Sequence, residues 1–442
     1  MYEKIIDFLK KISSHEGIKI YSENLFFISL EKTVRIVIGF FVGIYVARAL
    51  TPQYYGLFNY ILSFVTVFSI LSLPFLNNIA IREMAKSENN CGKILGVLRS
   101  IKLSGAAIMI AAIIGSTYLI TMDNSTRYLI WLLSIGAFFA GSEYYSSYFV
   151  FKRQNKIISL VSLGLFLVVS LFRIYFAYQK FPLRDFIILE TFFLLGMVLG
   201  LKIIFVKQTN FQLTSDADER KKFLNVAKVL FLAEIFSAIY TKADILILKE
   251  LVSNHDLGLF TAAVRIIESC SFISIAFGNT FYPSIANSKN VSENLYLYRL
   301  KLYIGVVFYI NLLCTIALII FAPLLAKLFG SNYSGVSELI MLYSLKLPFF
   351  GVAVPFGQHL YLENRIKYLS LSAFVSMILM ISGIIIFTEY FGIRGAALCG
   401  VAVQIPVLFL LPWLCGKKEL SKIVFTAIIF FPKEIYHKIK TL

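Results

Sequence analysis

The most regular feature of the sequence is a series of long apolar runs separated by short polar segments. The run IISLVSLGLFLVVSLF at 157–172 contains no charged residue, and its apolar positions are continuous instead of alternating. A strand of a membrane barrel alternates along its length, whereas a spanning helix needs about 20 mostly apolar residues in succession. The pattern therefore predicts an all-α polytopic membrane protein.

Twelve apolar runs are long enough to span a membrane, and the connections between them are short. The longest connection, KQTNFQLTSDADERKK at 207–222, follows the sixth run, where a protein of six plus six helices would join its halves. Pro74, inside the second run, is an expected bending point because proline removes a backbone donor. The expected spans are 25–47, 54–81, 97–121, 128–151, 157–179, 183–206, 223–248, 257–286, 302–327, 336–361, 367–388 and 395–415.

On this basis the chain divides into five parts. Residues 1–22 lack the continuous apolar core of a signal peptide, and they suit either an amphipathic helix on an anionic leaflet or a plain charged tail. The predicted parts are an N-terminal segment (1–22), an N-lobe (23–207), a cytoplasmic linker (208–222), a C-lobe (223–415) and a basic C-terminal tail (416–442).

One short turn occurs twice in the chain. YYGLFNY at 54–60 is closely matched by DLGLFTA at 256–262, and each copy opens an apolar run. Six predicted helices separate the copies, so both would face the same way across the membrane, as in transporters with a parallel repeat. Chance recurrence of GLF in apolar sequence is the alternative.

The composition agrees with a membrane protein, and the placement of charge predicts its orientation. The chain is 58% hydrophobic and 15% charged, with a net charge of +17, whereas soluble domains carry about 25% charged residues. Basic residues concentrate in cytoplasmic loops, and most of the 42 here lie on one side of the predicted spans. The exceptions on the other side are Arg48, Arg127, Lys180, Arg184, Lys249, Lys327 and Arg394. Both termini are therefore predicted to be cytoplasmic, and the absence of a soluble domain argues against nucleic-acid binding.

The sequence contains no recognisable catalytic or metal-binding motif. Its five cysteines lack metal-like spacing, and no Walker loop, GxSxG, HExxH or CxxC pattern occurs. We therefore expect a secondary-type transporter instead of an enzyme, with no metal site and no cofactor beyond a coupling ion.

Charged residues inside the predicted spans are the candidate functional residues, because each costs about 2.5–3.5 kcal/mol at the centre of a membrane helix. In the first span, Glu31 and Arg35 are four residues apart and can pair, while Lys32 and Arg35 can jointly present positive charge. Either the bases bind an anion, or the cluster is a satisfied pair beside a lysine that extends to the membrane surface.

The seventh span places Glu234 and Asp244 on one helical stripe with two hydroxyl residues, while Lys242 lies off that stripe. Such a stripe can bind a proton or a cation, or Asp244 can neutralise Lys242 or a base on another helix. Arg265 and Glu268 follow in the eighth span. Lone charges elsewhere are Lys346, Arg173, Glu143 and Glu190.

Two segments resemble a known family. GFFVGIYVARALTPQYYGLFNYILSF at 39–64 resembles the start of Wzx-type O-antigen and polysaccharide-unit flippases of the multidrug/oligosaccharidyl-lipid/polysaccharide (MOP) exporter superfamily, and YTKADILILKELVSNHDLGLFTAAVRI at 240–266 resembles their seventh-to-eighth helix junction. The resemblance implies two six-helix bundles in a V shape, as in MATE-type exporters, around a central cavity. It also implies export of an undecaprenyl-pyrophosphate-linked oligosaccharide by alternating access.

The same resemblance suggests where the cargo binds. Related lipid II flippases use arginines of the first and eighth helices, which Arg35 and Arg265 match here, although KIVFTAIIFF at 422–431 is too short to supply their extra helices. We therefore expect Arg35, Lys32, Arg265 and Lys346 to bind the pyrophosphate, which arginine can clamp in bidentate fashion. The expected ion-coupling or charge-balancing residues, with H+ or Na+ as the ion, are Asp244, Glu234, Glu31, Glu268 and Lys242.

The predicted protein is thus a monomeric flippase of the bacterial inner membrane that serves O-antigen, lipopolysaccharide or another surface glycan, and the glycan polymerase machinery is an expected partner. Two alternatives stay open. A cation-coupled multidrug exporter of the same fold would have an acidic central cavity and would confer drug resistance. A polytopic glycan polymerase or ligase would be expected to carry a sizeable external loop.

Overall fold

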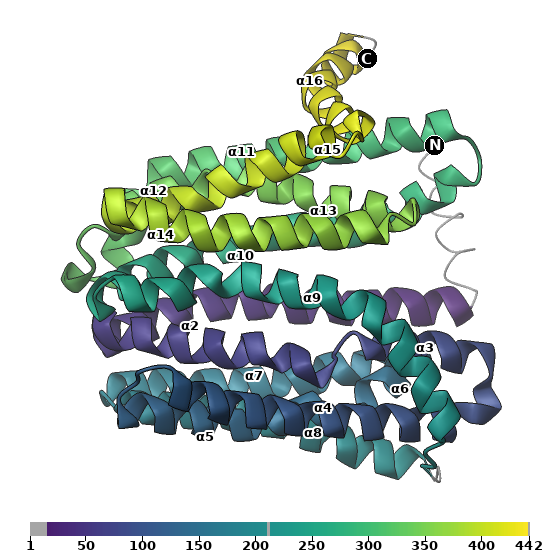
Figure 1. Ribbon diagram of the computed structural model, residues 1–442, viewed down its shortest axis with the longest axis horizontal. Helices are drawn as coiled ribbons and strands as arrows, with labels where there is room; N and C mark the ends of the chain where they lie inside the picture. The colour runs from purple at the N-terminus through teal and green to yellow at the C-terminus, as the bar shows by residue number, and fades with distance from the viewer. Residues whose placement is uncertain (1–15, 210–212, 441–442) are drawn as a thin grey trace, which may run out of the picture. The chain divides into compact units, whose positions relative to one another are not determined.

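The computed structural model describes residues 16–209 and 213–440, and all regular structure in these ranges is helical (Figure 1). The predicted N-terminal amphipathic segment falls largely outside the described residues. The helices are α2 (Glu16–Ser69), α3 (Leu76–Lys86), α4 (Cys91–Leu119), α5 (Asn124–Ser142), α6 (Tyr145–Phe151), α7 (Asn155–Tyr178), α8 (Leu183–Gln208), α9 (Ala217–Leu251), α10 (Asn254–Lys289), α11 (Glu293–Phe329), α12 (Val336–Ser344), α13 (Leu347–Leu362), α14 (Ile366–Ile405), α15 (Leu411–Leu414) and α16 (Lys418–Lys440). Short 3-10 or π turns are η1 (Ile70–Ser72), η2 (Glu88–Asn90), η3 (Ser331–Tyr333) and η4 (Pro406–Leu410).

The described ranges contain eight helical stretches that are long and apolar enough to cross a membrane, or nine when the bent stretch at α9 counts as one span. Two of these stretches are interrupted by a residue with positive φ, Thr51 (φ 63°) in α2 and Gly392 (φ 59°) in α14. Thr51 precedes Pro52, and a residue before proline is pushed out of the α region; glycine adopts positive φ without a steric penalty. Each interrupted stretch therefore supplies two of the predicted spans.

In two of the predicted spans, a residue with non-helical backbone breaks the helix. The span predicted at 54–81 ends with η1 and a left-handed residue, Leu73 (φ 57°), before α3 begins. Leu73 precedes Pro74, so the proline that was expected to bend this helix ends it instead. The span predicted at 128–151 is divided into α5 and α6 by Glu143, whose backbone is extended.

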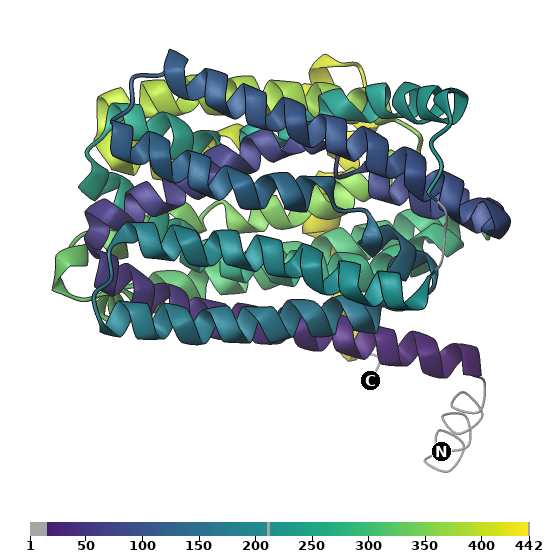
Figure 2. The same cartoon turned by 90° about the horizontal axis from the view of Figure 1, so that it is seen from below.

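Contacts between Cα atoms divide the chain into two units, although the boundaries differ from those of the predicted lobes. Unit 1 runs to Ala49 and from Phe64 to Phe231, and unit 2 comprises Leu50–Ser63 and the chain from Leu232 onward. In unit 1, α5 packs between α4 and α8, and α7 packs on α8 (Figure 2). A cluster of buried side chains from α3, α4, α6, α8 and α9 forms the core near one end of these helices.

The repeated GLF turn has a direct structural role within unit 2, where its two copies pack against each other. A Cβ atom on Gly258 would lie 1.9 Å from the backbone oxygen of Pro52, and one on Gly56 would lie 2.7 Å from the backbone nitrogen of Gly258. Small residues let helix backbones approach closely. Glycine is therefore required in both copies, because neither position has room for a side chain.

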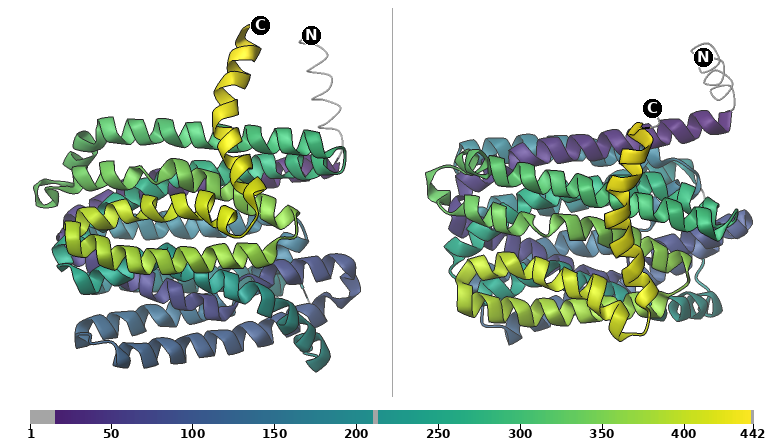
Figure 3. Two further views of the ribbon diagram at one scale, coloured as in Figure 1. Left: turned by 45° about the horizontal axis from the view of Figure 1, so that its top comes forward. Right: turned by 90° about the horizontal axis from the view of Figure 1, so that it is seen from above.

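Helix α16 is an ordered part of unit 2, which the prediction of a C-terminal tail did not include. It lies across α11 (Figure 3). Leu420, Val424 and Ala427 are fully buried and follow the spacing of one helix face. The Tyr309 hydroxyl on α11 donates a hydrogen bond to the backbone oxygen of Ile428, at 3.1 Å. The apolar run at 422–431 is too short to span a membrane, but the first part of α16, which contains it, packs against α11.

Candidate functional site

The predicted charges of the first span form a closed polar ring within unit 1. On α2, Arg35 Nε lies 3.0 Å from Glu31 Oε1, the spacing of an i,i+4 ion pair. Arg35 also donates to the Ser162 hydroxyl on α7, and that hydroxyl donates to Glu31 Oε1 at 2.7 Å. Three side chains from two helices thus fix one another.

Two aromatic rings also contact the Arg35 guanidinium. Its guanidinium carbon lies 5.3 Å from the ring centroid of Phe166 and 5.4 Å from that of Phe193, within the range of cation–π attraction. The Arg35 side chain keeps 38% of its surface exposed. Lys32, half-buried on the same helix, makes no hydrogen bond or ion pair within the described residues. The sequence left two alternatives open, a satisfied Glu31–Arg35 pair or bases that can bind an anion. The structure contains both the pair and, in Lys32, a base without an ion pair in the described residues.

The charges of the seventh and eighth spans form a second cluster, within unit 2. Lys242 on α9 donates to Glu268 on α10 at 3.1 Å. Asp244, only 4% exposed, accepts a hydrogen bond of 2.8 Å from the Tyr343 hydroxyl on α12. Lys242 therefore pairs with the neighbouring helix and not with Asp244.

Lys346 joins this second cluster from the other side of Tyr343. Its Nζ lies 3.6 Å from the Tyr343 ring centroid, a close cation–π contact. The Glu268 carboxylate lies within electrostatic range of Lys346 and Arg265 as well as Lys242. Five of the predicted site residues thus gather here. Lys32 and Arg35 belong to unit 1, so a single site that contains all four predicted bases stays a prediction.

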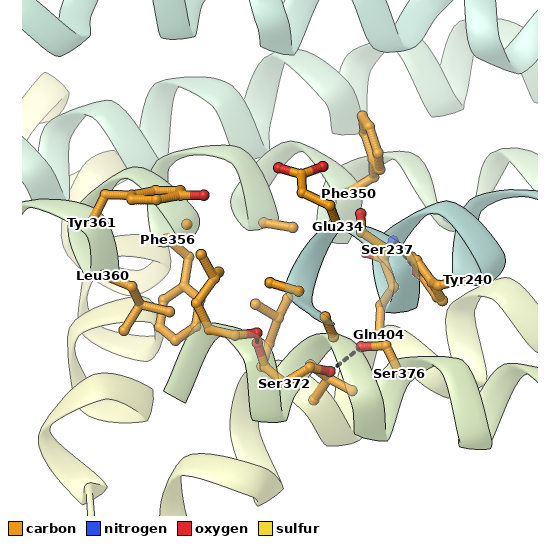
Figure 4. Close-up of a pocket in the computed structure, with 17 residues that line it drawn as sticks. Glu234, Ser237, Tyr240, Phe350, Phe356, Leu360, Tyr361, Ser372, Ser376 and Gln404 are labelled. Carbon is orange, nitrogen blue, oxygen red and sulfur yellow. Dashed lines mark hydrogen bonds between the residues drawn. The ribbon is translucent and has the colours of Figure 1, made fainter. Parts of the chain in front are cut away.

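Glu234 belongs to neither cluster and lines a cavity of about 300 Å³ within unit 2 (Figure 4). The carboxyl group of Glu234 makes no hydrogen bond or ion pair within the described part of the chain. Ser372 and Ser376 of α14 line the cavity across from it. Gln404 adds an amide group, which donates to the Tyr240 hydroxyl at 3.2 Å.

The sequence analysis missed these α14 residues. Ser372 and Ser376 are four residues apart in the predicted eleventh span, and Gln404 is a polar residue inside the predicted twelfth. Uncharged polar residues at helical spacing within an apolar run were a usable signal. The rest of the cavity wall is apolar, with Phe350, Phe356 and Leu360 among its residues.

The remaining lone charges are satisfied locally in unit 1. Arg173 on α7 pairs with Glu190 on α8. Glu143 accepts hydrogen bonds from the backbone nitrogen of Ser146, at 2.6 Å, and from its hydroxyl, at 2.8 Å, at the start of α6. These three residues hold helices together or cap them, and nothing in their geometry indicates a binding site.

Comparison with known proteins identifies the family of this chain. A family model described as polysaccharide biosynthesis protein matches residues 22–289, which include both copies of the GLF turn and the charged residues of α2, α9 and α10. The chain belongs to this family. No curated protein sequence is significantly similar to it.

Solved structures of two kinds share the fold of this family member. The lipid II flippase MurJ in an inward closed conformation aligns with a TM-score of 0.69 at 16% identity, covering 94% of this chain and 93% of MurJ. An inward-facing multidrug resistance MATE transporter of the MOP superfamily aligns with a TM-score of 0.64 at 17% identity, covering 91% and 99%. An outward-facing MATE transporter gives 0.60 at 18% identity, covering 92% and 96%. The predicted membrane fold of the MOP superfamily is thereby confirmed.

Proposed function

We propose that the protein is a flippase that moves a polyprenyl-pyrophosphate-linked oligosaccharide from the inner to the outer leaflet of the bacterial cytoplasmic membrane, for O-antigen or another surface polysaccharide. The family match supports a role in making polysaccharide, and the fold is shared with exporters and with a lipid flippase. In this proposal both termini are cytoplasmic, the transporter acts as a monomer, and a glycan polymerase receives the cargo.

The observation that carries the proposal is the setting of Arg35 and Lys32. Glu31, Ser162 and two aromatic rings hold the Arg35 guanidinium in one orientation while part of it stays accessible. A preorganised guanidinium loses little conformational entropy when it binds a pyrophosphate. Lys32 adds a positive charge that forms no ion pair within the described residues.

The bases of unit 2 would serve the same anion in the transport cycle. Lys346 and Arg265 lie near Glu268, which already pairs with Lys242. A pyrophosphate that approaches this cluster would compete with the Glu268 carboxylate for the bases. Such an exchange of partners allows binding without leaving a buried charge unpaired.

For coupling, we propose that Glu234 takes up the H+ or Na+ and that Asp244 has a structural role. Asp244 is buried and accepts from Tyr343, whereas Glu234 faces a cavity with hydroxyl and amide oxygens across from it. A carboxylate with oxygen neighbours is suited to a hard cation or to a proton. The coupling ion is exchanged at this cavity while the pyrophosphate contacts the bases.

The test is made in the source cell. The gene is deleted, lipid-linked oligosaccharides are extracted, and their membrane face is determined by their accessibility to an impermeant glycosidase. Single repeat units trapped on the cytoplasmic face, with surface glycan lost, would establish the flippase. Complete units that reach the outer face unpolymerised would indicate a polymerase or ligase instead, and an unchanged glycan would contradict the proposal.

A second candidate function is favoured by one specific observation, the Glu234 cavity. Its single carboxylate and its aromatic wall of Phe350 and Phe356 would also suit an organic cation. In that case the deletion strain would become sensitive to cationic drugs while its surface glycan stayed normal. The same strain therefore separates the two functions.

A further inference from the structure

A second cavity in unit 2 lies where α11 begins, α13 ends and α16 begins. Its volume is about 270 Å³, and its lining includes Lys301 on α11 and Lys422 on α16. Leu297 and Ile423 add apolar surface between the charged groups. The cavity thus joins positive charge to apolar lining at the end of the bundle, on the side that the lysine and arginine pattern predicts to be cytoplasmic.

Most of the acidic groups near this cavity are already neutralised. Glu363 lies 2.8 Å from Lys289, whose hydrogen bond lowers the pKa of the Glu363 carboxyl. Glu419 lies 3.0 Å from Arg365, whose hydrogen bond lowers the pKa of the Glu419 carboxyl. Both carboxylates are therefore ionised and paired at neutral pH.

Three charged side chains of the lining make no ion pair or hydrogen bond within the described residues, namely Lys301, Lys422 and Glu293. They leave one net positive charge. The buried Tyr296 hydroxyl and His359 Nδ1 are bonded to each other at 2.6 Å, so their polar atoms satisfy one another. Of these three side chains, the two lysines can attract an anion.

The outward side of α16 indicates what kind of molecule carries that anion. Phe425 and Ile429, one helical turn apart, are 59% and 47% exposed, although the stripe formed by Leu420, Val424 and Ala427 is fully buried. Helices with exposed aromatic and aliphatic residues beside lysines lie in the interface between lipid headgroups and acyl chains. An anion that reaches Lys422 from this side therefore arrives with acyl chains attached.

We propose that the cavity binds the phosphate of an anionic phospholipid in the adjacent leaflet, with Lys301 and Lys422 as its contacts. The acyl chains lie against Phe425 and Ile429, and the bound lipid links α16 to α11. This site is separate from the charged clusters of the spans and does not depend on what the protein transports.

The experiment measures the thermal unfolding of the purified full-length protein in detergent with added lipid. Phosphatidylglycerol is expected to raise Tm, whereas phosphatidylcholine, which carries no net charge, is expected to have little effect. Lys301→Gln combined with Lys422→Gln is expected to abolish most of the rise. Two lysines correspond to a roughly thirty-fold weaker interaction with the anionic lipid, at about 1 kcal/mol for each lysine.

Lys418→Gln is the matched control, because Lys418 is also an exposed α16 lysine but lies over the Trp413 ring and outside the cavity lining. The control is expected to respond to phosphatidylglycerol as the wild type does. Retention of phosphatidylglycerol in native mass spectra gives a second measurement on the same variants. An equal rise in the double variant would overturn the proposal, and an equal rise with inorganic phosphate would show a site for a soluble anion instead.

Discussion

The two charged clusters use the same residue types in different ways. In unit 1, Glu31, Ser162 and two rings all contact one arginine, so a single base is held firmly beside a lysine that forms no ion pair in the described ranges. In unit 2, the charges are spread over α9, α10 and the junction between α12 and α13, and the buried acid, Asp244, accepts its hydrogen bond from a hydroxyl instead of a base. The first arrangement presents one preorganised cation, whereas the second allows several partners to exchange.

The largest effect on export is expected from a substitution in the unit 1 cluster. Arg35→Ala should reduce export by about 100-fold, because it removes a hydrogen bond to a charged group worth about 1.5–3 kcal/mol and also leaves Glu31 without its base. Arg35→Lys should restore only part of the activity, since lysine lacks the planar fork. Surface glycan and trapped lipid-linked units are measured in the complemented deletion strain.

The control for Arg35→Ala is Arg173→Ala, which also removes a spanning arginine that is paired with a glutamate. Export by the control, corrected for the amount of protein in the membrane, should stay close to that of the wild type. Equal losses in the two variants would mean that Arg35 matters only for folding.

The next effect concerns the buried acid of unit 2. Tyr343→Phe should lower the free energy of unfolding by about 1.5–3 kcal/mol, because Asp244 would lose a hydrogen bond while it stays buried. Tyr240→Phe removes a hydrogen bond between two neutral groups, to Gln404, and should cost about 1 kcal/mol. Thermal unfolding of both variants in one detergent makes the comparison, and a larger loss for Tyr240→Phe would contradict the structural role of Asp244.

The third prediction compares two acids of α9. Glu234→Gln should reduce export by about tenfold and abolish its dependence on the coupling ion, because Glu234 lines the cavity and makes no ion pair with any residue that the structure describes. Asp244→Asn should keep the ion dependence even where it lowers the amount of folded protein. Transport in vesicles with imposed proton and sodium gradients gives the measurement. If the ion dependence is lost only in Asp244→Asn, the roles of the two acids are reversed.

The sequence predicted the positions of most of the apolar stretches, because length and apolar continuity are local properties. It also singled out the charged residues that form the clusters, since charge in an apolar run is conspicuous, although Lys346 was expected to be a lone charge. Partners across helices could not be predicted: Ser162 is an ordinary serine in an apolar run until packing places it against Arg35. The pairing of Lys242 with Glu268 likewise depends on how α9 and α10 face each other.

The docking of α16 was missed although its pattern is present in the sequence. Leu420, Val424 and Ala427 follow helical spacing. The length of the apolar run, however, indicates only that it cannot span a membrane, and says nothing of which helix it packs against. The end of the second span at Leu73 was missed for a related reason, because Pro74 was interpreted as a bend inside a helix. In both cases a local signal was visible, and its consequence depended on tertiary packing.

The smallest effect is expected for an ion pair outside the two clusters, between the exposed side chains of Glu419 and Arg365. Glu419 and Arg365 join α16 to α14, and the pairing lowers the pKa of Glu419 below its ordinary value of about 4.3. A lowered pKa means that the pair stabilises the docked helix above that value and that this stabilisation is lost as pH falls through the folded-state pKa. Glu419→Gln should therefore destabilise the docking at neutral pH by less than about 1 kcal/mol, since exposed pairs contribute little.

Hydrogen exchange of the α16 amides checks this prediction at two pH values. Exchange in Glu419→Gln should be slightly faster than in the wild type at pH near 7, and the difference should vanish in acid below the folded-state pKa of Glu419, once each pH is corrected for the intrinsic exchange rate. Glu338→Gln is the matched control, because Glu338 also forms an exposed ion pair, with Arg394 at 2.9 Å, and lies on α12 instead of α16. A difference that persists in acid would show that Glu419 acts through packing instead of charge. In that case the Glu419–Arg365 pair would differ from the ion pairs of the clusters in how its side chains pack, and not only in how far they are exposed to water.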